Sequence, residues 1–128
     1  MFVMLCPANR DSDNLTVFLQ DPGSPGSFPT EPSATLATGH RPTSVTAADL
    51  NGDGALDLVS ANEGSDNLTV FFQDPGDPGS FTEPTAIGGP GITDLARSVT
   101  AADLNGDGAL DLVSANLGSD NLTVFLNR

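Results

Sequence analysis

Acidic side chains recur at alternating positions in two short loops of the sequence. Oxygen-bearing side chains occupy loop positions 1, 3, 5 and 9, and a glycine at position 6 allows the tight bend that turns them inward. Ca²⁺ takes six to eight oxygen ligands, and loops of this kind add a backbone carbonyl at position 7. The candidate calcium ligands are Asp49, Asn51, Asp53, the Ala55 carbonyl and Asp57, and again Asp103, Asn105, Asp107, the Ala109 carbonyl and Asp111.

Other interpretations of these two loops agree less well with the sequence. Zinc prefers His and Cys, which both loops lack, and Mg²⁺ demands stricter octahedral geometry and retained waters. An EF-hand would place Glu at position 12, where this sequence has Ser60 and Ser114. Asn-Gly and Asp-Gly are also signals for a plain hairpin turn with solvated acids. A turn needs only two residues, whereas all five motif positions are filled in both copies, so we expect two Ca²⁺ sites.

The loops lie inside a long internal repeat. Ser44–Phe71 and Ser98–Phe125 align at an offset of 54, and 27 of the 28 positions are identical. The single difference is Glu63 against Leu117. A third, partial copy stands near the N-terminus without a calcium loop. The repeats divide the chain into a partial first repeat (1–40), a complete repeat with a calcium loop (41–94) and a partial last repeat with a calcium loop (95–128).

Clusters of Gly, Pro, Asn and Asp divide each unit into short stretches typical of β-strands. The complete unit predicts four strands, of which the fourth contains Pro84 and suits an outer edge. No stretch has the 3.6-residue spacing of an amphipathic helix. The expected strands are Ser44–Ala48, Leu56–Ala61, Asn67–Gln73 and Ser80–Ile87.

Composition excludes several classes of function. The 128 residues carry 17 acidic and 4 basic side chains, a net charge of −13, so a nucleic-acid partner is excluded on electrostatic grounds. No apolar run is long enough to insert into a membrane. A lone cysteine, Cys6, rules out an internal disulfide, and we expect it to pack as a small core side chain. With His40 in a Gly/Pro loop, no constellation supports catalysis, and we expect no catalytic residues.

The run SVTAADLNGDGALDLVSAN, followed by a TVF strand, resembles the FG-GAP or VCBS-type repeat of integrin-α-like β-propellers. The resemblance implies an all-β fold of four-stranded antiparallel propeller blades, with the calcium loop between the first two strands of a blade. It also assigns the family's calcium ligands to the ten positions given above. Val-Ser-Ala-Asn stands here where the family has its Phe-Gly and Gly-Ala-Pro signatures.

The chain is short for a propeller. Closed propellers have about four to eight blades, whereas this sequence spans about 2.4 repeats. It therefore predicts either an incomplete propeller that is a fragment of a longer protein, or an open blade stack, or a homo-oligomer in which another chain supplies the missing fourth strand. Of these we favour a fragment of a larger propeller protein.

The resemblance implies an extracellular or cell-surface location, although no signal peptide is readable in the chain. We expect a calcium-binding scaffold for binding or adhesion, with a protein or glycan partner that the sequence does not identify. A carbohydrate-binding propeller is the first alternative, against which the absence of Trp and Tyr counts. A non-catalytic module attached to a secreted enzyme is the second.

Overall fold

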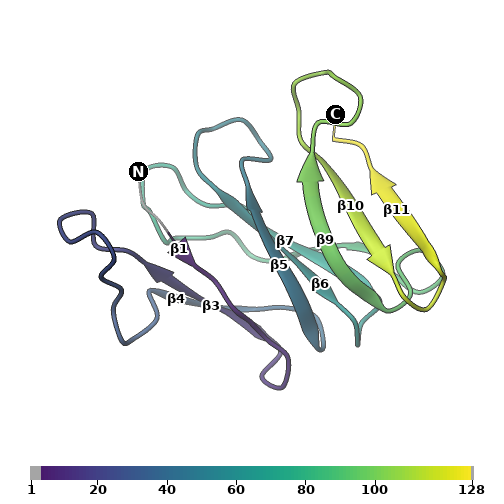
Figure 1. Ribbon diagram of the computed structural model, residues 1–128, viewed down its shortest axis with the longest axis horizontal. Coiled ribbons are helices and arrows are strands. Elements are labelled where there is room, and N and C mark those ends of the chain that lie inside the picture. The colour runs from purple at the N-terminus through teal and green to yellow at the C-terminus, as the bar shows by residue number, and fades with distance from the viewer. Residues whose placement is uncertain (1–3, 128) are drawn as a thin grey trace.

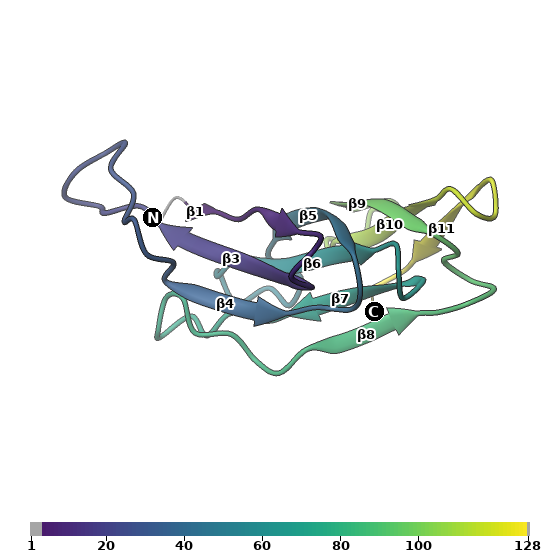
Figure 2. The ribbon, with the colours of Figure 1, turned by 90° about the horizontal axis from the view of Figure 1, so that it is seen from below.

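The fold is all β, as the sequence predicts (Figure 1). The computed structural model describes residues 4–127, and these form three antiparallel sheets. Figures 1 and 2 show the sheets side by side, and none of them closes on itself. The first sheet contains β1 (Met4–Leu5), β2 (Ala8–Asn9), β3 (Asn14–Leu19) and β4 (Ala34–Ala37); the second β5 (Pro42–Ala48), β6 (Asp57–Asn62), β7 (Asn67–Phe71) and β8 (Thr85–Gly88); the third β9 (Ala96–Ala102), β10 (Asp111–Asn116) and β11 (Asn121–Phe125).

The second sheet is a four-stranded meander in the order β5-β6-β7-β8. Its fourth strand starts at Thr85, five residues later than the sequence predicts, because Ser80–Pro84 belongs to the preceding loop. Proline has no N–H to donate to a strand ladder, and before it only Phe81 forms a bridge, with Gln73. The third sheet reproduces the first three strands of this meander.

The first sheet is interrupted where the other two are continuous. β1 and β2 both pair with β3, separated by Cys6 and Pro7, while β4 pairs with the same β3 strand. Pro7 occupies the place of Ser60 in the second sheet and cannot donate a ladder hydrogen bond. The break therefore follows from one residue type within an otherwise similar sheet.

The hydrophobic core lies between the sheets rather than within any one of them. Between the first and second sheets, Leu15 and Val17 of β3 pack with Leu58 and Phe71, and none of the four is more than 1% exposed. The second and third sheets meet through an equivalent cluster. Its buried members are Val59, Ala61, Leu68, Val70, Ala96, Val99 and Leu112.

Polar contacts repeat between the sheets at the same places. Asp13, in the turn that precedes β3, accepts a hydrogen bond from the Arg41 backbone N–H at 2.8 Å, at the start of the second sheet. Asp66, the equivalent turn residue of the second sheet, accepts one from the Leu95 N–H at 2.8 Å, at the start of the third. Both aspartates have φ of 54°, a left-handed conformation that Asp tolerates. The turn of one sheet thus fixes the first strand of the next.

Identical residues in the second and third sheets differ sharply in burial. Leu68 is fully buried, whereas Leu122, at the same repeat position, is 68% exposed. Val70 is 2% exposed and its equivalent Val124 is 50% exposed. The second sheet is covered by the third, and no other part of residues 4–127 covers the corresponding face of the third sheet.

This difference predicts unequal effects of the same substitution. L68A removes a fully buried side chain and should lower the free energy of unfolding by about 3 kcal/mol. L122A removes an exposed one and should change it by less than about 0.5 kcal/mol. Urea denaturation of the two variants measures both values, and equal losses would contradict the observed packing.

Candidate functional site

The two predicted calcium loops lie at corresponding places in adjacent sheets. Residues 49–57 connect β5 to β6, and residues 103–111 connect β9 to β10. Most side chains of both loops are exposed, and each loop ends in a buried aspartate, Asp57 or Asp111. The ten predicted positions therefore lie in two loops that each connect the first and second strands of a sheet.

Asp49 organises the first loop through its carboxylate. Its Oδ1 accepts hydrogen bonds from the N–H of Gly52 (2.8 Å) and Asp53 (3.2 Å), and its Oδ2 accepts one from Gly54 (2.9 Å). Gly54 has φ of 90°, so its position in the bend favours glycine. Asp53 in turn accepts a hydrogen bond from the Ala55 N–H at 2.9 Å. The loop is thus wound around its first carboxylate.

The second loop has the same arrangement. Asp103 accepts hydrogen bonds from the N–H groups of Gly106, Asp107 and Gly108 at 2.7, 3.2 and 2.9 Å. Asn51 and Asn105 each accept one from the N–H two residues ahead, at 3.2 and 3.1 Å. In the second loop only, the Asn105 Nδ2 also donates to Asp107 Oδ2 at 2.9 Å. Repeated sequence has therefore produced repeated loop geometry.

Asp57 and Asp111 join the loops to the sheets. Asp57 is fully buried, and its two oxygens accept hydrogen bonds from the Leu50 and Gln73 N–H groups, both at 2.9 Å. Asp111 does the same with Leu104 and Asn127, also at 2.9 Å. Each aspartate thus connects the start of its loop to the second residue after the third strand of its sheet.

The pKa of Asp57 is raised above the ordinary value for aspartate, mainly because burial penalises its charged form. The hydrogen bonds from Gln73 and Leu50 oppose this rise, and the charges of Asp53 and Asp49 add to it. The three carboxylates of the first loop therefore lie close enough to interact electrostatically.

Whether these loops can hold a metal ion depends on the ligand atoms that their residues offer. Within residues 4–127, no three His, Cys, Asp or Glu side chains stand together in an arrangement that could hold a metal ion. Asp49 and Asp53 turn oxygens toward loop N–H groups instead. A carboxylate oxygen has a second lone pair, so one N–H partner leaves it able to bind a cation. The oxygen-only donor set is the one that Ca²⁺ prefers.

Two further residues with reactive side chains lie outside the loops. Cys6 packs against the core between the first and second sheets, and burial raises the pKa of its thiol to about 11. The His40 Nδ1 lies 3.0 Å from Asp13 Oδ2 on the surface. An unreactive thiol and an exposed ring do not form a catalytic arrangement.

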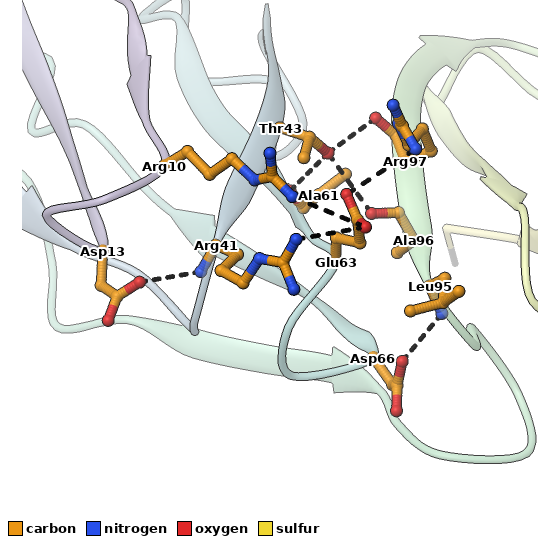
Figure 3. A network of polar contacts seen from close by, with 10 residues as sticks. All are labelled: Arg10, Asp13, Arg41, Thr43, Ala61, Glu63, Asp66, Leu95, Ala96 and Arg97. Carbon is orange, nitrogen blue, oxygen red and sulfur yellow. Dashed lines mark hydrogen bonds and ion pairs between the residues drawn. The ribbon is translucent and has the colours of Figure 1, made fainter.

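Sequence reasoning missed a charge cluster at the other end of β5 and β6 (Figure 3). Glu63 is 8% exposed, and three guanidinium groups surround it at 3.7 to 3.9 Å: those of Arg10, Arg41 and Arg97. Its buried Oε2 has no hydrogen-bond partner. The signal was present in the sequence, since Glu63 is the one residue by which the two long copies differ. The cluster joins residues from all three repeats.

Comparison with known proteins agrees with the repeat pattern. A family model described as FG-GAP-like repeat matches residues 2–60 and again residues 49–114. Together the two matches span most of the chain. A search of curated proteins found no match.

The raised pKa of Asp57 predicts a pH dependence in the calcium-free chain. A carboxyl group whose folded pKa exceeds its unfolded pKa contributes stability below the unfolded pKa, and this contribution is lost as pH rises through the folded pKa. The D57N variant has no carboxyl group at this position, so its stability lacks this contribution. The free energy of unfolding of the wild type, minus that of D57N, should therefore fall as pH rises through the folded pKa of Asp57. Urea denaturation in chelator across acidic pH measures this difference; a rise instead of a fall would contradict the assigned direction.

The Glu63 cluster predicts that removing the glutamate and removing the three arginines have different effects on stability. E63L installs the residue of the third repeat and removes a buried oxygen without a partner, so stability should stay within about 1 kcal/mol of wild type or increase. R10A/R41A/R97A leaves the carboxylate buried without its counter-charges and should cost about 2 kcal/mol, less than a fully buried pair because the arginines are half-exposed. Chemical denaturation distinguishes the two, and a larger loss for E63L would contradict this reading.

Proposed function

The chain belongs to the FG-GAP-like repeat family, and on that basis we propose that it is a calcium-binding repeat module of a larger protein. In this proposal each loop holds one Ca²⁺, through the oxygens of Asp49, Asn51, Asp53, Asp57 and the Ala55 carbonyl, and of their equivalents Asp103, Asn105, Asp107, Asp111 and the Ala109 carbonyl. The module acts as a scaffold for binding or adhesion outside the cell or at its surface. It has no catalytic activity of its own.

The observation that carries the proposal is the winding of both loops around their first aspartate. Three backbone N–H groups converge on Asp49, and three on Asp103. These bonds fix the curvature of the loop before any cation arrives. A plain two-residue hairpin turn needs no such arrangement. A loop that holds several carboxylates in a fixed arrangement favours a hard divalent cation, because such cations bind oxygen ligands.

Calcium would stabilise this chain through charge as well as through geometry. Each loop carries three aspartates in a chain of net charge −13. The charges of Asp53 and Asp49 add to the rise in the pKa of Asp57 that burial causes. A divalent cation removes most of that repulsion. Because Asp57 also bonds to Gln73 beyond the third strand, order in the loop extends to the sheet.

The scaffold role rests on the family and on the lack of catalytic chemistry in the described part of the chain. In the described residues the Cys6 thiol, with its raised pKa, is a poor nucleophile, and the exposed His40 ring makes its side-chain hydrogen bond with Asp13 alone. In residues 4–127 there is no helix that is long and apolar enough to cross a membrane. High free calcium outside cells suits loops of modest affinity, which is why we place the module there.

The test is calcium titration of the loop variants. Wild type should bind two Ca²⁺ by isothermal titration calorimetry, D53A and D107A one each, and D53A/D107A none. With a Kd of about 0.1 mM and about 2 mM free calcium, each occupied site should add about 1.8 kcal/mol to the free energy of unfolding. Thermal melts with calcium and with chelator measure that gain.

D77A is the matched control, since it removes the same charge from an exposed residue outside both loops. It should retain two sites and the full calcium-dependent gain. Heat release that is equal in wild type and D53A/D107A, or a melt that calcium does not change, would refute the proposal.

A further inference from the structure

The two predicted calcium loops lie side by side. Both project from the same edge of the sheets (Figure 1). Leu50 and Gly52 of the first loop, and Gly108 and Leu110 of the second, line one groove between the second and third sheets. The loops are therefore close enough for a single side chain to contact both.

The side-chain amide of Asn127 makes that contact. Asn127 is the second residue after β11, and its Nδ2 donates to the Leu50 carbonyl at 2.6 Å and to the Leu110 carbonyl at 3.1 Å. Leu50 is position 2 of the first loop, and Leu110 is position 8 of the second. A primary amide nitrogen has two hydrogens, so each loop receives one of them. One side chain thus bridges the two loops.

This bridge ends on the two buried aspartates of the loops. The Leu50 N–H donates to Asp57 Oδ2 at 2.9 Å, and the Asn127 N–H donates to Asp111 Oδ1 at 2.9 Å. Both aspartates are fully buried, and each is position 9 of its loop, a predicted calcium ligand. A continuous path of hydrogen bonds therefore connects a ligand of one loop to the equivalent ligand of the other.

The equivalent residue of the second sheet holds only its own loop. Gln73 stands at the repeat position of Asn127. Its N–H donates to the buried aspartate of its loop at 2.9 Å and its Nε2 to the Leu56 carbonyl at 2.8 Å. Its Oε1 accepts a hydrogen bond from the Gly79 N–H at 2.8 Å. Within residues 4–127, Gln73 makes no hydrogen bond to a second loop of this kind. The bond from Asn127 to Leu50 is thus an addition to the contacts that the repeat itself provides.

We propose that Asn127 couples the two calcium sites, so that calcium in one loop raises the affinity of the other. The inference rests on the proposed function, because it concerns the regulation of the same two sites. When a cation holds Asp111, the second loop is ordered, and Asn127 extends that order to Leu50 in the first loop. Coupling between binding sites is reciprocal, so the first loop acts on the second by the same factor.

The physical basis is the ordering that each loop needs in order to hold a cation. Ordering a loop costs conformational entropy, and a loop that its neighbour has already ordered loses less of it on binding. One hydrogen bond joins the bridge to the first loop, so the coupling should be about threefold to tenfold. Repulsion between two bound cations acts in the opposite direction, but it does not pass through Asn127, and salt screens it.

The test is isothermal titration calorimetry with calcium chloride in about 0.15 M salt. The coupling ratio is the product of the two association constants of the wild type, divided by the product of the single constants of D53A and D107A. This ratio should be about 3 to 10. When all three proteins also carry N127A, the ratio should fall to about 1, because such a cycle cancels any direct effect of N127A on one loop. N127A keeps the backbone N–H that bonds to Asp111, so it should fold.

Amide hydrogen exchange supplies a second readout. In D53A only the second loop binds calcium, yet calcium should still slow the exchange of the Leu50 N–H in the first loop. This protection should disappear in D53A/N127A. L126A is the matched control, since it shortens the neighbouring side chain, which is 45% exposed and has no donor for either loop. It should keep both the coupling ratio and the protection.

The outcomes separate the inference from the proposed function. A wild type that binds no calcium would overturn both. Two bound calcium ions with a coupling ratio of one or less would overturn the coupling and leave the two sites intact. A ratio above one that N127A does not change would show that the loops communicate by another route and would overturn the role of Asn127.

Discussion

Packing between sheets is the interaction on which the rest of this structure depends. A sheet of three or four short strands has two faces and cannot cover the apolar side chains of either. Leu15 and Val17 are buried only because the second sheet lies against them, and Leu68 and Val70 only because the third does. The molecule therefore behaves as a repeat protein, in which each unit is stabilised by contact with its neighbour.

The two ends of the sheets hold this packing by different means. At one end, Asp57 and Asp111 hydrogen-bond to the second residue after the third strand of each sheet and so connect the two predicted calcium loops to the sheets. At the other end, Asp13 and Asp66 bond to the start of the next sheet, beside the Glu63 cluster. The predicted calcium-binding positions thus lie at the opposite end of the sheets from the Glu63 cluster.

The Glu63 cluster distinguishes the second repeat from the nearly identical third one. Over 28 positions the two long copies differ only at Glu63 and Leu117, so backbone pairing and core packing hardly distinguish one from the other. Charge does distinguish them, because Glu63 lies among arginines from all three repeats. Replacing a buried ion cluster by apolar residues often costs little stability, and its better-attested use is to specify register.

The sequence by itself determined the all-β class, the repeat, the approximate strands and the position of both loops, because turn chemistry and strand patterning act over a few residues. It misplaced the start of β8, where Pro84 and the Phe81 loop delay pairing. Only the tertiary structure decided that Leu68 is buried while Leu122 is exposed, and that three distant arginines meet at Glu63. Identical segments have identical local preferences, so such differences arise from what each sheet lies against.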